Sequence, residues 1–348
     1  MKIAVVVPVE ESVPPVKYGG TELVAYNLVE GLVKNGHEVH LFATGDSKTS
    51  GTLHAVFPEP VRVLAPDPSD SKLREAFKYV AIGRALEEIL ADEQFDIVHN
   101  HIGWRWLPFQ NTYQAPTVTT LHGPLDSSYG KRVFEEYPDS KFVSISNDQR
   151  KKMPELPIEA TVYNGIDVKR FEYVGTPGEY LAFLGRMSPE KGPKQAIQAA
   201  LLAGERLVMA AKVDAVDQEY FKTEIEPLID GEQIKFLGEV DHAGKVELLK
   251  NAKGLMALIQ WDEPFGLFMA EAMACGTPVI AIPRGSVEEL VVPEKTGIYV
   301  HSVEEAAEAI KRIHTIDRAA CRKRAEENFS IESMVKGYEA VFEKLIAG

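Results

Sequence analysis

The sequence predicts an α/β protein of two domains, each built on a parallel sheet with helices on both faces. Its 348 residues exceed the usual size of one domain. Apolar strand-like runs alternate with helical stretches nearly throughout, which is typical of parallel sheets covered by helices. A polar Gly/Pro-rich segment at 174–179 separates two such series. We therefore expect a first domain over residues 1–172 and a second over 178–328.

In the first series, short apolar runs predict strands, and apolar residues at helical spacing predict helices. The expected strands are residues 3–7, 38–43, 56–64, 96–100, 117–121, 142–145 and 160–163. The expected helices are residues 21–34 and 73–90. Asn35-Gly36 ends the first of them, as helix C-termini often require.

The second series repeats the alternation. The expected strands are residues 180–184, 207–210, 234–237, 254–258, 279–282 and 297–300. The expected helices are residues 267–275, 306–313, 319–328 and 331–346. In the last helix Met334, Val335, Tyr338 and Phe342 recur at helical spacing, which predicts one buried face.

Composition narrows the class of protein. Hydrophobic residues make up 45 % and charged residues 26 %, as in ordinary globular proteins. The net charge of −14 disfavours binding to nucleic acid or anionic membranes. The two cysteines, Cys275 and Cys321, form no disulfide framework, which fits a reducing cytoplasm. No apolar run reaches 18 residues and no signal peptide is apparent, so we expect no integral membrane segment.

Two glutamates, Glu263 and Glu271, frame the most informative motif. Pro264 and Gly266 suit the start of a helix, and Gly276 is placed to end it. Helix N-termini offer unpaired amides and a positive dipole end to an anion. The two carboxylates lie up to ~12 Å apart along such a helix. That span suits a sugar, a pyrophosphate and a ribose laid in a row.

Other polar motifs fall where strands end, which is where open parallel sheets bind ligands. Gly19-Gly20-Thr21 precedes a helix, so it either lets the backbone approach a phosphate or sugar or forms a plain turn capped by Thr21. It is not a dinucleotide-binding Gly-x-Gly-x-x-Gly. His99 and His101 alternate at one strand end and either form hydrogen bonds there or line a ligand cleft.

His122 ends the next strand, and Asn164 begins an Asn-Gly-Ile-Asp turn that favours an Asx-type structure. In the second series, Arg186 and Lys191 flank a loop after the first strand. The chain contains no Asp-x-Asp, so these two cations and the amides near Gly266 are candidates for holding a diphosphate without metal. The sequence thus predicts no metal site and no resident cofactor.

Taken in order, these motifs resemble the retaining glycosyltransferases of family 4, also called glycosyl transferases group 1, which have the GT-B fold. The resemblance covers nearly the whole chain. It implies two Rossmann-like domains with parallel sheets facing a central cleft, the last helix (331–348) packing back onto the first domain. In this family the first Glu contacts hydroxyls of the donor sugar and the second binds the ribose, which assigns those roles to Glu263 and Glu271.

The resemblance also assigns the remaining site residues. Arg186 and Lys191 would grip the diphosphate, and His122 would touch the donor sugar, so that these three and Glu263 form the catalytic set. The expected donor-binding residues are Gly19, Gly20, Arg186, Lys191, Lys212, Gly238, Val240, Glu263, Phe265, Gly266, Leu267, Phe268 and Glu271. The expected acceptor-side residues are Thr21, His99, His101 and Asn164.

The implied activity is transfer of a hexose from a nucleoside-diphosphate sugar to an acceptor hydroxyl, with retention and by front-face attack. UDP is the favoured nucleotide because it is the commonest in such enzymes, and the acceptor would be a small molecule or a saccharide. The alternatives are a GT-B glycoside phosphorylase, a sugar-nucleotide epimerase and a non-catalytic sugar-nucleotide sensor. The intact set of Glu263, Glu271, Arg186 and Lys191 argues against the sensor.

Overall fold

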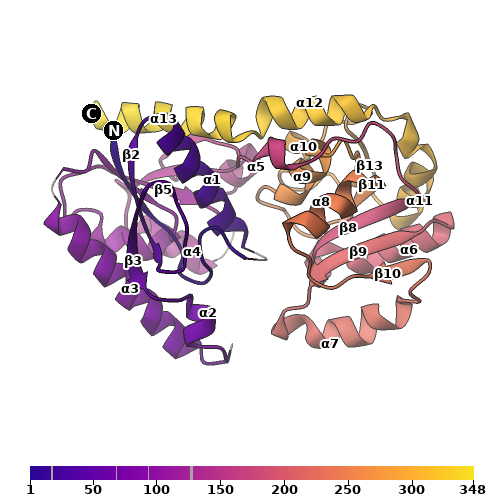
Figure 1. The fold of residues 1–348 in the computed structure, drawn as a ribbon, viewed down its shortest axis with the longest axis horizontal. Helices are drawn as coiled ribbons and strands as arrows, with labels where there is room; N and C mark the ends of the chain where they lie inside the picture. The colour runs from indigo at the N-terminus through magenta and orange to yellow at the C-terminus, as the bar shows by residue number, and fades with distance from the viewer. Residues whose placement is uncertain (17–18, 68, 93, 126–127) are drawn as a thin grey trace. The chain divides into compact units, whose positions relative to one another are not determined.

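The computed structural model describes residues 1–16, 19–67, 69–92, 94–125 and 128–348. The chain forms two compact units, which are described separately. Unit 1 holds Met1–Gly165 and Ile331–Gly348, and unit 2 holds Ile166–Ser330. Both chain ends therefore belong to unit 1 (Figure 1). Residues 174–179 lie inside unit 2, where the buried Arg318 donates to the carbonyl of Val174 at 2.7 Å.

Unit 1 is built on one parallel sheet with the strand order β3-β2-β1-β4-β5-β6-β7 among its described residues. Its strands are β1 Lys2–Val6, β2 Glu38–Thr44, β3 Thr52–Phe57, β4 Ile97–Asn100, β5 Thr117–Leu121, β6 Lys141–Ser144 and β7 Ile158–Thr161. β1 pairs with both β2 and β4 in parallel. The strand order reverses between β1 and β4, so a crevice opens beyond their carboxyl ends.

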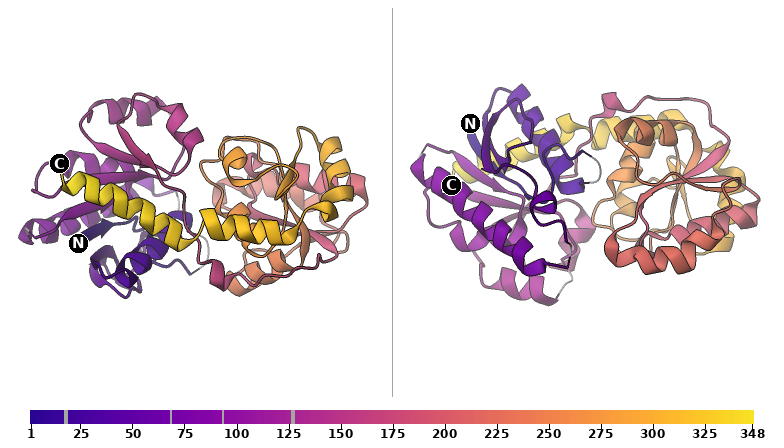
Figure 2. Two further views of the ribbon diagram at one scale, coloured as in Figure 1. Left: turned by 90° about the horizontal axis from the view of Figure 1, so that it is seen from above. Right: turned by 60° about the horizontal axis from the view of Figure 1, so that its bottom comes forward.

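The helices of unit 1 cover this sheet, as Figures 1 and 2 show. They are α1 Gly20–Lys34, α2 Val61–Leu64, α3 Ser71–Ala91, α4 Ser128–Glu135, α5 Asn147–Lys152, α13 Ile331–Ile346 and the 3-10 helix η1 Gly103–Phe109. The final helix α13, yellow in Figure 1, packs beside α1. Met334, Val335, Tyr338 and Phe342 form its buried face.

One predicted element of unit 1 is wrong. Residues 56–64 were expected to form a strand, but β3 ends at Phe57 and residues 61–64 form the short helix α2. Pro58 and Pro60 explain the difference, because proline has no backbone N–H to donate to a sheet. Pro60 stands at the N-terminal cap of α2, where the missing donor costs nothing.

Unit 2 holds the second parallel sheet, with the strand order β10-β9-β8-β11-β12-β13 among its described residues. Its strands are β8 Tyr180–Arg186, β9 Leu207–Lys212, β10 Ile234–Phe236, β11 Ala252–Ala257, β12 Val279–Ala281 and β13 Gly297–Tyr299. Its helices include η3 Pro189–Lys191, α6 Pro193–Ala203, α8 His242–Lys250, α9 Leu267–Ala274, α10 Val287–Leu290, α11 Val303–Arg312 and α12 Arg318–Asn328. The strand order reverses between β8 and β11, which sets the carboxyl ends of these two strands beside each other.

None of the helices in the described ranges is both long enough and apolar enough to cross a lipid bilayer.

Candidate functional site

In unit 2, a rigid loop carries Glu263 to the N-terminus of α9. Gly266 is the N-cap of α9 with φ 81°, and a Cβ there would lie 2.4 Å from the methyl carbon of Met269. Only glycine fits this position. The loop is also held from behind, because the Ser286 amide donates to the Glu263 carbonyl at 2.9 Å and the Ser286 hydroxyl to the Phe265 carbonyl at 2.7 Å. These contacts hold the backbone at Glu263 and Phe265 in place.

The carboxylate of Glu263 meets Lys191. The Nζ of Lys191 lies 2.5 Å from Oε2 of Glu263, and the Trp261 indole donates to the same oxygen at 3.1 Å. Lys191 comes from η3, directly after β8, and its Nζ lies 5.0 Å from the centroid of the Trp261 ring and 5.8 Å from that of Phe268. Glu263 is only 7 % exposed. The pair thus joins the loop after β8 to the start of α9 inside a largely buried environment.

Arg186 and Lys212 stand at the ends of the neighbouring strands β8 and β9. Arg186 donates to Glu190 at 2.7 Å, and Lys212 lies 2.8 Å from Asp214. Asp214 also approaches Arg186, at 4.0 Å. Partial burial opposes ionisation of Glu190, yet its polar contacts and the nearby cations, Arg186 among them, hold its pKa below the ordinary value. Each of these cations therefore already has a carboxylate partner.

Glu271, one turn into α9, forms a second ion pair that the sequence did not reveal. Its carboxylate is bonded by Lys245 of α8, and Glu271 is only 4 % exposed. The Nζ of Lys245 also lies 5.5 Å from the centroid of the Phe171 ring. Lys245 belongs to no recognisable motif, and only the packing of α8 against α9 brings it to Glu271.

The other predicted donor-binding residues of unit 2 border the same strand ends. Gly238 follows β10, and its carbonyl accepts from Ala211 at 2.9 Å, while Val240 lies half-buried just beyond. Leu267 and Phe268 are half-buried in the first turn of α9. Phe265 differs from these, because its ring is buried against Phe329 and serves the core.

In unit 1, the predicted histidines form one hydrogen-bonded chain. His122 Nε2 lies 2.8 Å from His101 Nδ1, and His101 Nε2 lies 3.2 Å from His99 Nδ1. His99 Nε2 continues to the hydroxyl of Thr120 at 2.7 Å, and that hydroxyl reaches Tyr338 of α13 at 2.9 Å. The sequence separates these groups, and the ends of β4 and β5 bring them together.

All three imidazoles are neutral at physiological pH. Burial lowers the pKa of His99 to about 3 and that of His122 to about 4, and it lowers the pKa of His101 well below its ordinary value. A neutral imidazole has one donor and one acceptor nitrogen, so the direction of one bond sets the direction of the next. The two directions are not equivalent, because Tyr338 is buried and Thr120 is its hydrogen-bond partner in the described structure, so its hydroxyl hydrogen is satisfied only when Tyr338 donates to Thr120. In that direction each group donates toward His122, and the outer nitrogen of His122, Nδ1, carries the proton.

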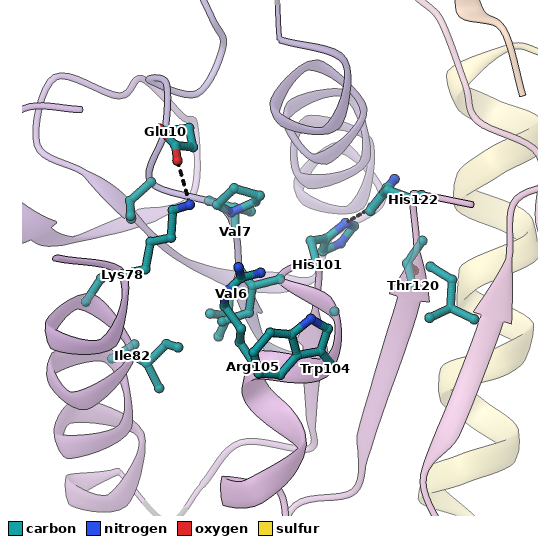
Figure 3. A pocket seen from close by; sticks show the side chains of 18 of the residues that line it. Val6, Val7, Glu10, Lys78, Ile82, His101, Trp104, Arg105, Thr120 and His122 are labelled. Carbon is teal, nitrogen blue, oxygen red and sulfur yellow. Dashed lines mark hydrogen bonds and ion pairs between the residues drawn. The ribbon is translucent and has the colours of Figure 1, made fainter. Parts of the chain in front are cut away.

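His101 and His122 line a pocket of about 380 Å³ in unit 1, shown in Figure 3. The pocket lies beyond the carboxyl ends of β1, β4 and β5, at the point where the strand order reverses. Side chains from α3 and η1, among them Ile82 and Trp104, form further walls. His99 is not among the lining residues, because it is buried against Tyr338 and Phe342 instead.

The remaining candidates of unit 1 lie outside the pocket lining. Gly19 is the N-cap of α1, and Gly20 and Thr21 begin that helix. Asn164 is buried, and its Oδ1 is one of the side-chain atoms without a hydrogen-bond partner in the described structure. Glu22, in the first turn of α1, is also buried, and burial raises its pKa to about 7. Within the described ranges, no three His, Cys, Asp or Glu side chains gather in a way that could hold a metal ion.

Comparison with known protein families covers both units. The family model described as Glycosyltransferase Family 4 matches residues 18–170, and the model described as Glycosyl transferases group 1 matches residues 168–328. Among curated proteins, the glycogen synthase of Mycobacterium tuberculosis is 26 % identical over 361 residues, covering 90 % of this chain and 86 % of its own.

Solved structures share the fold. Sucrose-phosphate synthase from Thermosynechococcus elongatus superposes with a TM-score of 0.82 at 20 % identity, covering 99 % of both chains. The Anabaena protein HepE in complex with UDP-glucose gives a TM-score of 0.73 at 18 % identity, covering 99 % of this chain and 100 % of its own. Two parallel α/β units, both family models and these relatives lead to one conclusion: the chain has the GT-B fold and is an enzyme of glycosyltransferase family 4.

Proposed function

We propose that the protein moves a hexose from a nucleoside-diphosphate sugar, with a UDP-sugar favoured, to the hydroxyl of a small-molecule or saccharide acceptor. The anomeric configuration would be retained, and no metal ion would be required. The buried, unpaired thiols of Cys275 and Cys321 are compatible with work in a reducing cytoplasm.

The observation that carries this proposal is the buried pairing of Lys191 with Glu263 at the start of α9. A carboxylate in this position accepts protons from sugar hydroxyls, while the cation and the α9 amides favour an adjacent phosphate. Glu271 lies one turn further on, at the distance where a ribose would follow. The order of groups along α9 thus matches the order of groups in a nucleotide sugar.

Charge stabilisation of the leaving group would come from Arg186 and Lys191. As the bond between the anomeric carbon and the diphosphate breaks, negative charge grows on the leaving oxygen, and nearby fixed cations lower the energy of that state. The acceptor oxygen forms the new bond on the same face of the sugar, and its proton passes to the leaving phosphate oxygen. The nucleoside diphosphate departs, and no covalent enzyme intermediate is needed.

The preference for UDP rests on likeness. The similar fold of HepE has been solved with UDP-glucose bound, and that protein shares 18 % identity with this chain. Thermal unfolding of the protein in the presence of UDP, GDP or ADP compares its affinity for the three nucleotides. UDP should give the largest rise in Tm. A larger rise with GDP or ADP would reassign the base.

The activity itself is tested by incubating the protein with UDP-, GDP- and ADP-glucose and measuring nucleotide release, with and without EDTA. Release that persists in EDTA, with a product of unchanged anomeric configuration by NMR, is the expected result. A requirement for inorganic phosphate in place of a nucleotide sugar would indicate a phosphorylase. Recovery of an altered nucleotide sugar would indicate an epimerase, and binding without turnover a sensor.

The site assignment is tested by Glu263→Gln, which keeps the shape of the side chain. We expect turnover to fall by about 10²–10³-fold, as when one preorganised electrostatic contact is lost. The far-UV circular dichroism should stay unchanged. Glu308→Gln on the exposed face of α11 is the matched control, since Glu308 is 71 % exposed. Wild-type turnover in Glu263→Gln would remove Glu263 from the catalytic set.

A further inference from the structure

The pocket of unit 1 has a chemical character of its own. Its walls are mainly apolar, with Val7, Val9, Ile102, Trp104, Leu125 and Phe134 among the lining residues. Its volume of about 380 Å³ falls in the range of pockets that bind small organic ligands. It also stands where the strand order of the sheet reverses, which is where ligands of such sheets bind. A pocket with these properties is suited to a compact apolar body.

The polar groups at the strand ends of this pocket are almost all engaged with one another. Both ring nitrogens of His101 are bonded, to His122 and to His99. The hydroxyl of Thr120 is shared between His99 and Tyr338. His101, Thr120 and His122 line the pocket. Among these three, only His122 has a side-chain polar atom, Nδ1, without a protein hydrogen-bond partner in the described structure. Figure 3 shows this second nitrogen on the side of the ring away from His101.

The charged groups of the lining neutralise one another. Lys78 lies 2.8 Å from Glu10 and 2.9 Å from Glu75, and Arg105 lies 3.1 Å from Glu75. The guanidinium of Arg105 also lies 4.7 Å from the centroid of the Trp104 ring. Each of these cations therefore already has a carboxylate partner.

These observations distinguish between classes of acceptor. A saccharide would bury several hydroxyls against apolar walls, and each hydroxyl without a partner costs free energy. A molecule with one hydroxyl would place it at His122 Nδ1 and bury its apolar remainder against Ile82, Trp104 and Leu125. Nδ1–H donates to the oxygen of that hydroxyl, which leaves the hydroxyl's own proton free for the leaving phosphate oxygen.

We propose that the acceptor is an alcohol with a compact aryl or alicyclic body, seated in the pocket of unit 1 with its hydroxyl at His122. This narrows the acceptor class of the proposed function and rests on that function for the transfer step. Binding of the alcohol to the pocket does not depend on the proposed transferase function. In the transfer step the acceptor O–H bond breaks, its oxygen bonds to the anomeric carbon, and the proton leaves with the diphosphate.

Binding is tested first, without any donor, by calorimetric titration of the full chain with 2-naphthol, cyclohexanol, myo-inositol and glucose. Cyclohexanol and myo-inositol share a six-membered carbon ring and differ in carrying one hydroxyl or six. We expect 2-naphthol to bind most tightly, cyclohexanol detectably, and the two polyols at least 10-fold more weakly than cyclohexanol. Equal or tighter binding of myo-inositol or glucose would overturn the proposal.

The location is tested by Trp104→Ala, which removes a wall that is only half-buried, so the fold should survive. Affinity for 2-naphthol should fall about 10-fold, as expected for the loss of one large apolar contact. Tyr79→Ala on α3 is the matched control, because Tyr79 is 50 % exposed and is not a lining residue. Unchanged affinity in Trp104→Ala, or an equal loss in Tyr79→Ala, would place 2-naphthol elsewhere and end the proposal.

Transfer is tested last, with the donor that gives nucleotide release in the absence of acceptor. Glycosylation of 2-naphthol in preference to glucose supports the acceptor class, and the reverse preference refutes it. If no donor is ever turned over, the transferase function fails, while the calorimetric result still decides whether the pocket takes an apolar alcohol. The two failures are therefore distinguishable.

Discussion

In unit 2 the candidate donor residues stand in cation–carboxylate pairs, whereas in unit 1 the candidate histidines stay neutral and share hydrogen bonds along one chain. Lys191–Glu263 and Lys245–Glu271 represent the first arrangement, and His122–His101–His99 the second. Buried polar groups need partners in both cases. Under the proposed function, the cations of these pairs exchange a carboxylate for the diphosphate when the donor binds, while the neutral chain meets an uncharged hydroxyl. The contrast therefore follows the chemistry of the two expected ligands.

The largest effect is expected when the cations of unit 2 are removed. In Arg186→Ala/Lys191→Ala, affinity for UDP should fall by about 100-fold, since each charge-assisted contact contributes roughly 1.5 kcal/mol. Calorimetric titration with UDP measures it. Lys311→Ala/Arg312→Ala on α11 is the control pair, because both side chains are more than half exposed. Undiminished affinity in the first variant would show that the diphosphate binds elsewhere.

The buried pair on α9 should matter for stability. Lys245→Met leaves the carboxylate of Glu271 buried without a cation, and we expect the free energy of unfolding to fall by about 3 kcal/mol. Denaturant unfolding measures the loss. Lys311→Met breaks an exposed pair with Glu308 and should cost less than about 0.5 kcal/mol. If both variants lost the same free energy of unfolding, the buried pair between Lys245 and Glu271 would contribute no more to stability than an exposed one.

The neutral chain of unit 1 should make stability depend on pH. Below pH 6.5 an unfolded histidine binds a proton that buried His99, with a pKa of about 3, does not. The free energy of unfolding therefore falls as the pH drops below 6.5, by up to about 1.4 kcal/mol per pH unit for each fully buried histidine. Glu22 acts in the opposite sense, because burial raises its pKa from 4.5 to about 7 and the native state holds the extra proton in that window.

Denaturant unfolding between pH 6.5 and pH 5 measures how the free energy of unfolding changes with pH, and so tests the opposite contributions of the histidines and of Glu22. Since His99, His101 and His122 outweigh the one glutamate, we expect a net loss of unfolding free energy on acidification from these four groups. The loss should be smaller in His99→Gln and larger in Glu22→Gln than in the wild type. Identical pH dependence in all three proteins would contradict the neutral state of this chain.

The smallest effect concerns the exchange of partners in unit 2. Glu190 competes with a phosphate for Arg186, and the pair is about one-quarter to one-third exposed. Glu190→Gln should therefore tighten UDP binding, by roughly threefold, since partly exposed ion pairs contribute under about 1 kcal/mol. Weaker binding of UDP in this variant would indicate that Glu190 orders Arg186 for the ligand.

Much of the fold follows from local pattern. The helix at 331–346 was predicted within its observed bounds, because Met334, Val335, Tyr338 and Phe342 mark one apolar face. The strand prediction at 56–64 failed where Pro58 and Pro60 broke an otherwise apolar run. Periodicity thus located elements well where one face is buried along their full length, and poorly where proline ends a strand early.

For the candidate site too, local sequence motifs identified some residues, while others were found only from the structure. Glu263, Glu271, Arg186 and Lys191 stand in motifs with their own glycines and prolines, so their type and spacing were readable. Lys245 was missed, because its partner Glu271 lies 26 positions away on another helix. Tyr338 was read only as a buried residue of the last helix, although its hydroxyl ends the histidine chain 218 positions from Thr120.

The sequence alone determined the two alternating α/β series and the family, and it predicted the residues expected to meet a nucleotide sugar, because these depend on residue type at short spacing. Tertiary structure decided which carboxylate each cation holds, that three histidines share one hydrogen-bonded chain, and that an apolar pocket opens beside His122. Those properties arise where strand ends and helices from distant segments meet. Burial there sets charge and pKa, and local sequence does not encode burial.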